Sequence, residues 1–251
     1  MQNISLEDNR KNIALLFDRI ALHYDLLNHL LTFSVDKYWR KKAIKHLDIP
    51  DYPDEINDTK ILDVATGTAD LAIEILKQKQ IRNLVGIDLS QSMLQIGRRK
   101  IQQFESSLNK TNSQFNIKFL QANVEQLPFE DDIFNVVTCG FGVRNFNDLE
   151  QGLKEMCRVL KPNGQIVILE FSYPQNLFVR CLYNVYFNYV LPFVGRIISK
   201  DNTAYKYLIK SVKEFPKGKK FLSYLDKVGF KKTDYKNLTC GIVSIYTGIK
   251  P

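Results

Sequence analysis

The feature that most constrains the fold is a regular alternation of short apolar runs and longer amphipathic segments between residues 60 and 171. The apolar runs have the length of buried strands, and the amphipathic segments have helical spacing. In chain order the predicted elements are strand 60–65, helix 70–79, strand 84–88, helix 91–107, strand 115–121, strand 133–139, helix 148–160 and strand 165–171. Strands that alternate with helices predict an α/β fold, with a parallel sheet covered on both faces.

Two helices are predicted ahead of this pattern. Apolar residues recur at helical spacing over 7–32, and a second helix is expected from Asp36, a residue type that favours the N-cap, to about residue 46. Residues 49–59 contain two prolines and several acids, which predicts a loop. We therefore expect an N-terminal helical lid over 1–48 and a separate main domain over 58–251.

The alternation breaks over 174–215, a stretch rich in aromatic residues. We expect helices there that form a cap over the carboxyl edge of the sheet, although these aromatics could equally be an ordinary buried core. A helix over 217–228 and strands near 230–235 and 242–248 complete the prediction. Gly164 is expected to take the left-handed turn after the helix 148–160.

Composition narrows the functional classes. The net charge is +8, and residues 196–236 hold twelve Lys or Arg against four Asp or Glu, an excess equal to that of the whole chain. A basic surface favours an anionic partner such as RNA or lipid headgroups, but it is also common on a solvated lysine-rich face. We see neither a signal peptide nor an apolar run long enough to span a membrane, which predicts a cytoplasmic protein.

Neither a zinc site nor a disulfide framework is expected. The four cysteines are far apart in the sequence and form no CxxC pair. The three histidines all lie in the predicted lid. We predict buried thiols, surface histidines and no metal.

The strand ends predict a nucleoside site. The turn after the first strand runs from Asp63 to Asp70 and includes Gly67, and the second strand ends in Asp88, 21 residues after Gly67. A carboxylate at that spacing can accept hydrogen bonds from both ribose hydroxyls, and the 121–125 segment can face an adenine edge. NAD and S-adenosylmethionine both fit this pattern, but the missing pyrophosphate turn favours S-adenosylmethionine.

Several further motifs resemble the ubiquinone/menaquinone biosynthesis C-methyltransferases over nearly the whole chain. The segments that carry the resemblance are 17–21, 24–28, 30–33, 36–40, 62–70, 121–129, 141–145, 158–162, 169–172, 191–192, 204–208 and 235–241. The N-terminal segments, Phe-Gly-Val-Arg-Asn at 141–145 and Tyr-Lys-Tyr-Leu at 205–208 are the most specific. The resemblance implies a Rossmann-like class I S-adenosylmethionine-dependent methyltransferase fold.

Cofactor contacts are implied for Thr68, Asp88, Asn123 and Val124, with Asp63 and Gly67 as further candidates in the first turn. A contact position that often holds serine in the family is Gly140 in this chain. Its backbone could contribute, but the side-chain hydrogen bond would be absent.

The resemblance also implies a reaction and an acceptor. The implied acceptor is a polyprenyl quinol. It must be the reduced quinol and not the quinone, because a ring carbon becomes a good nucleophile only when an adjacent hydroxyl loses its proton. Arg144 is expected to stabilise the resulting oxyanion or to position a water that takes the proton, Asn145 to hold the second oxygen, and Tyr24 to orient the ring. Without the resemblance, Arg144 and Asn145 would equally suit a helix-entry turn.

We favour a naphthoquinol, demethylmenaquinol, over a benzoquinol of ubiquinone biosynthesis. The apolar tail and the basic surface predict peripheral contact with an anionic membrane and no nucleic-acid partner. The alternatives are an RNA methyltransferase, a cofactor-binding protein without activity, and a methyltransferase for another small apolar molecule. The residues leave open whether the chain forms a homodimer.

Overall fold

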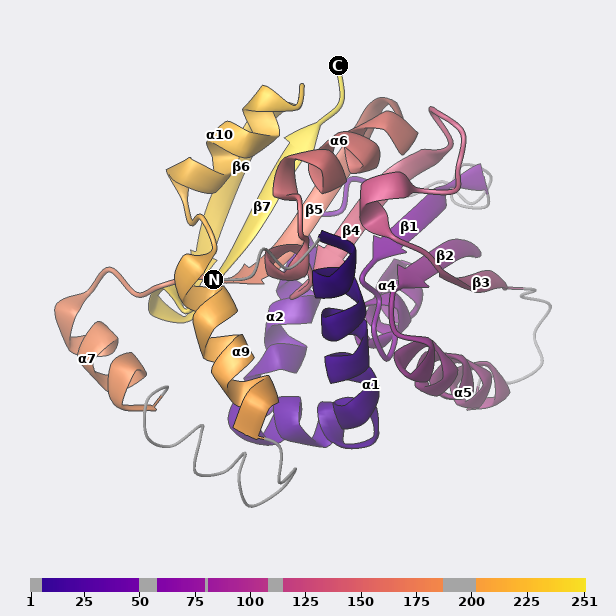
Figure 1. Ribbon diagram of the computed structural model, residues 1–251. Coiled ribbons are helices and arrows are strands. Elements are labelled where there is room, and N and C mark those ends of the chain that lie inside the picture. Colours follow the sequence, from indigo (N-terminus) through magenta and orange to yellow (C-terminus); the bar gives the residue numbers. More distant parts are fainter. Residues whose placement is uncertain (1–5, 50–57, 80, 108–114, 187–201) are drawn as a thin grey trace.

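The computed structural model describes residues 6–49, 58–79, 81–107, 115–186 and 202–251 (Figure 1). The helices are α1 (Leu6–Leu31), α2 (Val35–Ile44), α4 (Asp70–Lys79), α5 (Gln91–Ser107), α6 (Leu149–Val159), α7 (Leu177–Val185), α9 (Asn202–Glu214) and α10 (Lys219–Lys227). The strands are β1 (Lys60–Val64), β2 (Asn83–Asp88), β3 (Asn116–Gln121), β4 (Phe134–Gly140), β5 (Leu160–Phe171), β6 (Lys231–Leu238) and β7 (Val243–Ile249). Short 3-10 turns lie at η1 (Val124–Gln126), η2 (Val143–Asn145) and η4 (Thr239–Gly241).

These strands form one seven-stranded sheet with the order β3-β2-β1-β4-β5-β7-β6. Strands β1 to β5 run parallel to one another, and β7 lies antiparallel between β5 and β6. The predicted α/β class is confirmed. The chain order reverses direction across β1 and β4, and a sheet with such a switch point opens a crevice beyond its carboxyl ends.

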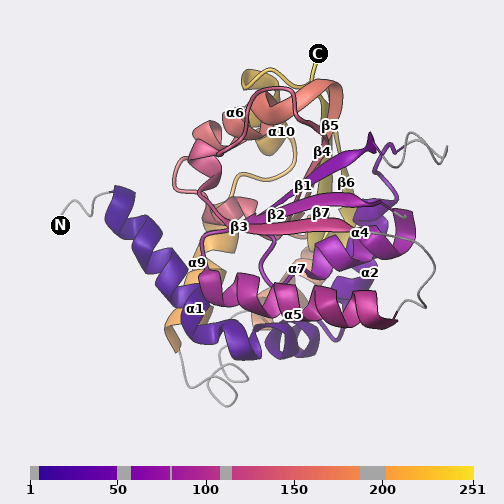
Figure 2. The ribbon, with the colours of Figure 1, turned by 90° about the vertical axis from the view of Figure 1, so that its right-hand side faces the viewer.

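Helices cover both faces of the sheet (Figure 2). On one face, α2, α4 and α5 pack through residues such as Trp39, Ile75 and Leu94. On the other face, α6 and α10 pack through Met156 and Phe221. Because both faces are covered, the central strands are apolar almost throughout, as the sequence pattern requires.

The junction between α1 and α2 differs from the prediction. The residue before α2 is Ser34, and both Phe33 and Ser34 adopt left-handed backbone angles, with φ of 51° and 59°. Asp36 is therefore not an N-cap. It lies inside α2, only 2% exposed, and it pairs with Arg40 one helical turn later.

Two smaller predictions also need correction. The left-handed residue after α6 is Asn163, with φ of 64°, and not Gly164. An added Cβ at Gly164 would lie 2.7 Å from the carbonyl oxygen of Lys161, so lack of space explains this glycine. Of the predicted buried thiols, Cys139 and Cys157 are buried, but the other two cysteines are exposed.

The predicted cap is described in part. Helices α7 and α9 occupy its two ends, and residues 187–201 lie outside the described residues. Most of the predicted loop 49–59 also lies outside them. Among the described helices, none combines the length and the apolar character that a membrane crossing requires.

Candidate functional site

Two adjoining cavities lie beyond the carboxyl ends of the central strands, under α1. The loop cavity is bounded by the turns after β1, β2, β3 and β4 and is lined by Ile13, Ala14, Phe17, Tyr24, Val64, Ala65, Gly67, Ile87, Asp88, Leu89, Ser90, Met93, Ala122, Asn123, Val124, Glu125, Gly140, Phe141, Gly142, Asn145, Phe146 and Asn147. The apolar cavity lies between α1, α2, α7 and α9. Phe17, Tyr24 and Phe141 line both cavities, so they form the wall between them.

Asp88 is the principal polar group of the loop cavity. Its Oδ2 accepts a hydrogen bond from the backbone N–H of Gly67 at 2.9 Å, and its Oδ1 accepts one from the N–H of Ser90 at 2.9 Å. Burial raises the pKa of Asp88, although these backbone donors oppose the rise. Each oxygen keeps a further lone pair, so the carboxylate can still accept hydrogen bonds from a vicinal diol.

Gly67 leaves space beside this carboxylate. Its φ is +55°, which only glycine adopts without strain, and no atom lies within 4 Å of the position that a Cβ would take.

Asn123, another residue that lines the loop cavity, caps the η1 turn by accepting a hydrogen bond from the N–H of Glu125 at 3.1 Å. The side chain of Asn123 is therefore partly committed to its own turn.

Five of the seven predicted cofactor contacts line the loop cavity, namely Gly67, Asp88, Asn123, Val124 and Gly140. Asp63 and Thr68 are not among the lining residues. The Thr68 hydroxyl is buried and hydrogen-bonds to Asp25 of α1, and Lys100 also contacts Asp25 at 2.9 Å. The structure thus places Thr68 in a contact between the turn after β1 and α1.

Asp63 lies beneath the same loop, 1% exposed. Its carboxylate accepts hydrogen bonds from the hydroxyls of Thr66 at 2.6 Å and Thr138 at 2.7 Å. Burial raises the pKa of Asp63 from 3.8 to about 6, because two hydroxyls compensate only part of the lost hydration. Asp63 therefore connects the turn after β1, through Thr66, to β4, through Thr138.

This raised pKa predicts a specific pH dependence of stability. The folded protein binds the Asp63 proton more tightly than the unfolded chain, so the stabilisation is complete below about pH 4 and is lost as the pH rises to about 6. The loss amounts to about 3 kcal/mol. Urea unfolding should show this fall in the free energy of unfolding between pH 4 and neutral pH in the wild type. The fall should be absent in Asp63→Asn. An identical pH dependence in both proteins would contradict it.

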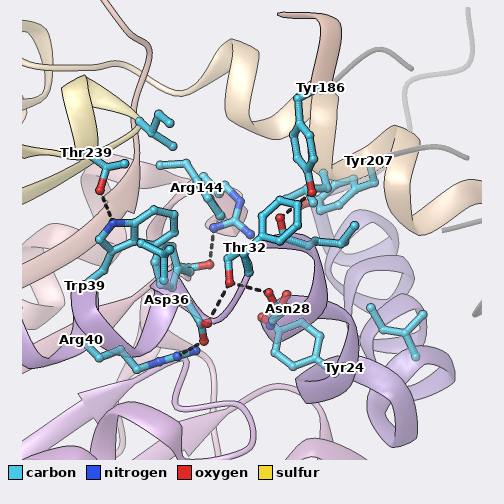
Figure 3. Close-up of a pocket in the computed structure, with 18 of the residues that line it drawn as sticks. Tyr24, Asn28, Thr32, Asp36, Trp39, Arg40, Arg144, Tyr186, Tyr207 and Thr239 are labelled. Carbon is cyan, nitrogen blue, oxygen red and sulfur yellow. Dashed lines mark hydrogen bonds and ion pairs between the residues drawn. The ribbon is translucent and has the colours of Figure 1, made fainter. Parts of the chain in front are cut away.

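The apolar cavity has a volume of about 310 Å³. Its lining is mostly aromatic and aliphatic and comprises Leu16, Phe17, Ile20, Tyr24, Asn28, Leu31, Thr32, Phe33, Val35, Asp36, Trp39, Arg40, Phe141, Arg144, Phe171, Tyr183, Tyr186, Tyr207, Leu208, Thr239 and Ile242 (Figure 3). Trp39, Phe141 and Phe171 form one aromatic cluster, with ring centroids 4.8 to 6.2 Å apart. Such walls suit a flat apolar ring.

Arg144 brings a buried positive charge to this cavity. Its side chain is 5% exposed and pairs with the fully buried Glu170, with Nη1 and Oε1 2.7 Å apart. Burial alone would lower the pKa of Arg144, but Glu170 outweighs it and the pKa is raised, so the guanidinium stays charged. Within the described structure, its buried Nε has no hydrogen-bond partner. An unpaired buried donor is uncommon in folded proteins and often marks a functional group.

The three predicted catalytic residues surround the boundary between the cavities. Arg144 lines the apolar cavity, Asn145 lines the loop cavity, and Tyr24 lines both. The Oδ1 of Asn145 accepts a hydrogen bond from Tyr207 at 3.2 Å, which links the two sides. Burial raises the pKa of Tyr24, so its phenol stays neutral near pH 7.

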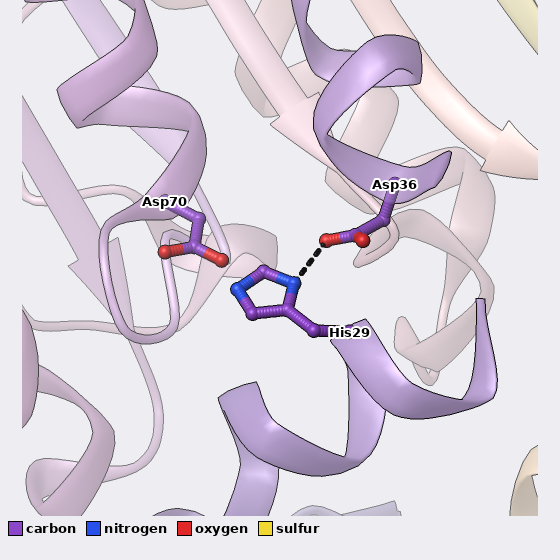
Figure 4. A group of neighbouring side chains, drawn as sticks. All are labelled: His29, Asp36 and Asp70. Carbon is purple, nitrogen blue, oxygen red and sulfur yellow. Dashed lines mark hydrogen bonds and ion pairs between the residues drawn. The ribbon is translucent and has the colours of Figure 1, made fainter. Parts of the chain in front are cut away.

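The sequence analysis does not predict a cluster of charged groups that lies at the C-terminal end of α1. His29 and Asp36 face one another across the α1–α2 junction, and Asp70 lies beside them (Figure 4). The predicted surface histidine is thus partly buried, with a side-chain exposure of 27%. Arg40 contacts both carboxylates, at 3.3 Å from Asp70, and Lys100 also pairs with Asp70. Because two cations already balance these carboxylates, we assign no metal to the cluster.

Comparison with known proteins gives a family match. Residues 4–250 match the model of the ubiE/COQ5 methyltransferase family. The chain is 43% identical to a ubiquinone/menaquinone biosynthesis C-methyltransferase of Geotalea daltonii, covering 98% of this chain and 99% of that protein. It is 39% identical to a demethylmenaquinone methyltransferase of Bacteroides fragilis, covering 97% and 95%. A solved S-adenosylmethionine-dependent methyltransferase of Thermotoga maritima, 17% identical, shares the fold with a TM-score of 0.62 over 95% of this chain and 99% of that one.

Proposed function

This chain belongs to the ubiE/COQ5 methyltransferase family, and we propose that it methylates a ring carbon of a polyprenyl naphthoquinol with S-adenosylmethionine as donor. The reaction converts demethylmenaquinol to menaquinol, the last step of menaquinone biosynthesis. The observation that carries the proposal is the buried Arg144 in an aromatic cavity that shares a wall with the loop cavity. A ring in one cavity then lies next to a donor in the other.

The residues of the loop cavity fit S-adenosylmethionine. Asp88 would hold the ribose hydroxyls, Asn123 and Val124 would lie along the adenine, and the open space at Gly67 and the backbone at Gly140 would admit the rest of the molecule. When bound, this cofactor supplies an electrophilic methyl group on a sulfonium. Helix α1 lines this cavity and would help to exclude water from it during the reaction.

Arg144 would stabilise the quinol oxyanion. The ring carbon becomes nucleophilic when the neighbouring hydroxyl is ionised, and a fixed cation in an apolar cavity favours that ionised form. The guanidinium lines the apolar cavity and its Nε has no hydrogen-bond partner within the described structure, which supports this role. Its pairing with Glu170 fixes the guanidinium in place before the substrate binds.

Tyr24 and Asn145 would position the ring. Tyr24 lies in the wall between the cavities and hydrogen-bonds to Asn28 on the same helix. Asn145 lines the adjoining loop cavity, is held by Tyr207, and would hold the second ring oxygen from that side. Both residues limit how the ring can turn, and alignment of donor and acceptor is the main demand of this reaction.

The prenyl tail would leave the cavity near Phe33 and Tyr186. Both residues line the cavity, and Phe33 is 79% exposed, which places it at the rim. Helix α7 leaves Leu177 and Phe178 more than two-thirds exposed. We propose that this apolar surface contacts the bilayer, where the substrate is dissolved.

A benzoquinol is the second candidate acceptor. The relative from Geotalea daltonii is named for both ubiquinone and menaquinone biosynthesis, and this supports a shared ring site in that protein. The family match favours either quinol over RNA as the acceptor.

The test is a methyl-transfer assay with both ring types in detergent. Each demethylated acceptor is supplied either chemically reduced or oxidised, and the methylated product is measured by mass spectrometry. We expect product from the reduced naphthoquinol and none from the oxidised form, because the quinone has no hydroxyl to ionise. Failure to methylate either reduced acceptor, in protein that binds S-adenosylhomocysteine, would contradict the proposal.

A further inference from the structure

The apolar cavity contains one carboxylate that the proposed function leaves without a role. Asp36 is the single acidic side chain among the described residues that line it. Its Oδ1 accepts a hydrogen bond from the Thr32 hydroxyl at 2.8 Å, and its Oδ2 contacts Nδ1 of His29 at 2.8 Å and also Arg40. Asp36 thus connects the interior of the cavity to a histidine with 27% side-chain exposure.

The proposed reaction needs a proton acceptor in the apolar cavity. The quinol O–H bond breaks and its electron pair enters the ring, and the ring carbon takes the methyl group from sulfur, which keeps the bonding pair. The C–H bond at that carbon then breaks and restores the aromatic ring. Two protons leave and one returns to the oxygen, so each turnover releases one proton in the cavity.

Other groups at the cavity are poor acceptors. Arg144 is already protonated, and Glu170 raises its pKa against the effect of burial. Burial raises the pKa of both Tyr24 and Tyr207, so these phenols already carry their protons near pH 7. Burial also opposes the charge on Asp36, but Arg40 and Thr32 outweigh it and keep the pKa of Asp36 below its usual value. Asp36 is therefore ionised when the quinol arrives, but it is a weak base and holds an accepted proton only briefly, so the proton has to be passed on.

The hydrogen bonds around Asp36 also accommodate its protonated form. The Thr32 hydroxyl lies 2.7 Å from the carbonyl oxygen of Asn28 and 2.8 Å from Asp36. One hydroxyl hydrogen cannot make two strong hydrogen bonds, so both contacts are satisfied together when Asp36 carries a proton and donates to Thr32.

We propose that Asp36 accepts the proton from the quinol hydroxyl and that His29 relays it toward solvent. The left-handed residues Phe33 and Ser34 make this possible, because they turn α2 back so that two residues seven positions apart face each other. This inference rests on the proposed quinol methylation. It assigns Asp36 a catalytic role and His29 a positioning and relay role.

The test compares Asp36→Asn and His29→Ala with the wild type under saturating reduced naphthoquinol. Asp36→Asn should lower kcat by about 100-fold or more, the usual effect of losing a general base, with S-adenosylhomocysteine binding unchanged. His29→Ala should also lower kcat, and added imidazole should restore it because the His29 site reaches solvent. The matched control is His46→Ala, because His46 lies outside the cavity. This variant should keep the wild-type kcat, and added imidazole should not change it.

Each outcome decides the inference. A folded Asp36→Asn protein with wild-type kcat would overturn it, and so would a His29→Ala protein with wild-type kcat or one that imidazole does not restore. If Asp36→Asn fails to fold, the imidazole experiment decides alone, because His29→Ala keeps the Asp36–Arg40 pair. A wild-type protein that methylates no quinol would instead overturn the proposed function.

Discussion

Replacing Arg144 with methionine is expected to lower the rate of methyl transfer by about 100- to 1,000-fold, the usual cost of removing one preorganised oxyanion donor. The same change should destabilise the protein by about 3–5 kcal/mol, because it leaves the charge of Glu170 buried without a partner. Glu170 is fully buried and its Oε1 lies 2.7 Å from Arg144. A loss of activity in this variant alone would therefore not separate chemistry from folding.

The double variant Arg144→Met with Glu170→Gln separates the two effects. It removes both charges, and the glutamine oxygen can still accept one of the two backbone hydrogen bonds, which the N–H groups of Arg144 and Phe171 give to different oxygens of Glu170. We expect urea unfolding to show most of the lost stability restored, while methyl transfer stays as low as in the single variant. Recovery of activity together with stability would show that Arg144 serves the fold and not the reaction.

Replacing Asp88 with alanine is expected to weaken binding of S-adenosylhomocysteine by about 100-fold, because hydrogen bonds to a charged acceptor contribute about 1.5–3 kcal/mol each. Part of the loss would be indirect, since Asp88 also orders the backbone at Gly67 and Ser90. Isothermal titration calorimetry measures the affinity. Glu130→Ala, an exposed acid outside both cavities, is the matched control.

Unchanged affinity in Asp88→Ala would mean that the ribose is held elsewhere. In that case the loop cavity would not be the nucleoside site, and the apolar cavity would lose its neighbouring donor.

Much of the fold follows from local patterns. The lengths of the apolar runs and the helical spacing predict elements that the structure contains, because each depends on neighbours in the sequence. The prediction of Asp36 as a helix N-cap is wrong because it depends on contacts that are not local. A local capping rule cannot register that Phe33 and Ser34 adopt left-handed angles, or that the carboxylate is buried against His29 and Arg40.

The candidate site shows the same limit. Strand ends predict that Gly67, Asp88 and Asn123 meet, since parallel strands end at one edge of the sheet. Sequence position does not tell which way a side chain points. In the structure the side chains of Asp63 and Thr68 do not line the loop cavity but bond to neighbouring residues. The contact of Thr68 with Asp25 joins residues 43 positions apart and depends on where α1 docks.

The central claim is that the acceptor ring binds in the apolar cavity beside Trp39 and Arg144. Trp39 is the chain's single tryptophan and lines that cavity, so its fluorescence reports directly on occupancy. A short-chain naphthoquinone, titrated in the presence of S-adenosylhomocysteine, should quench Trp39 to saturation and beyond the quenching of free N-acetyltryptophanamide. A protein that methylates the quinol but shows no saturable quenching would place the acceptor elsewhere and contradict the account.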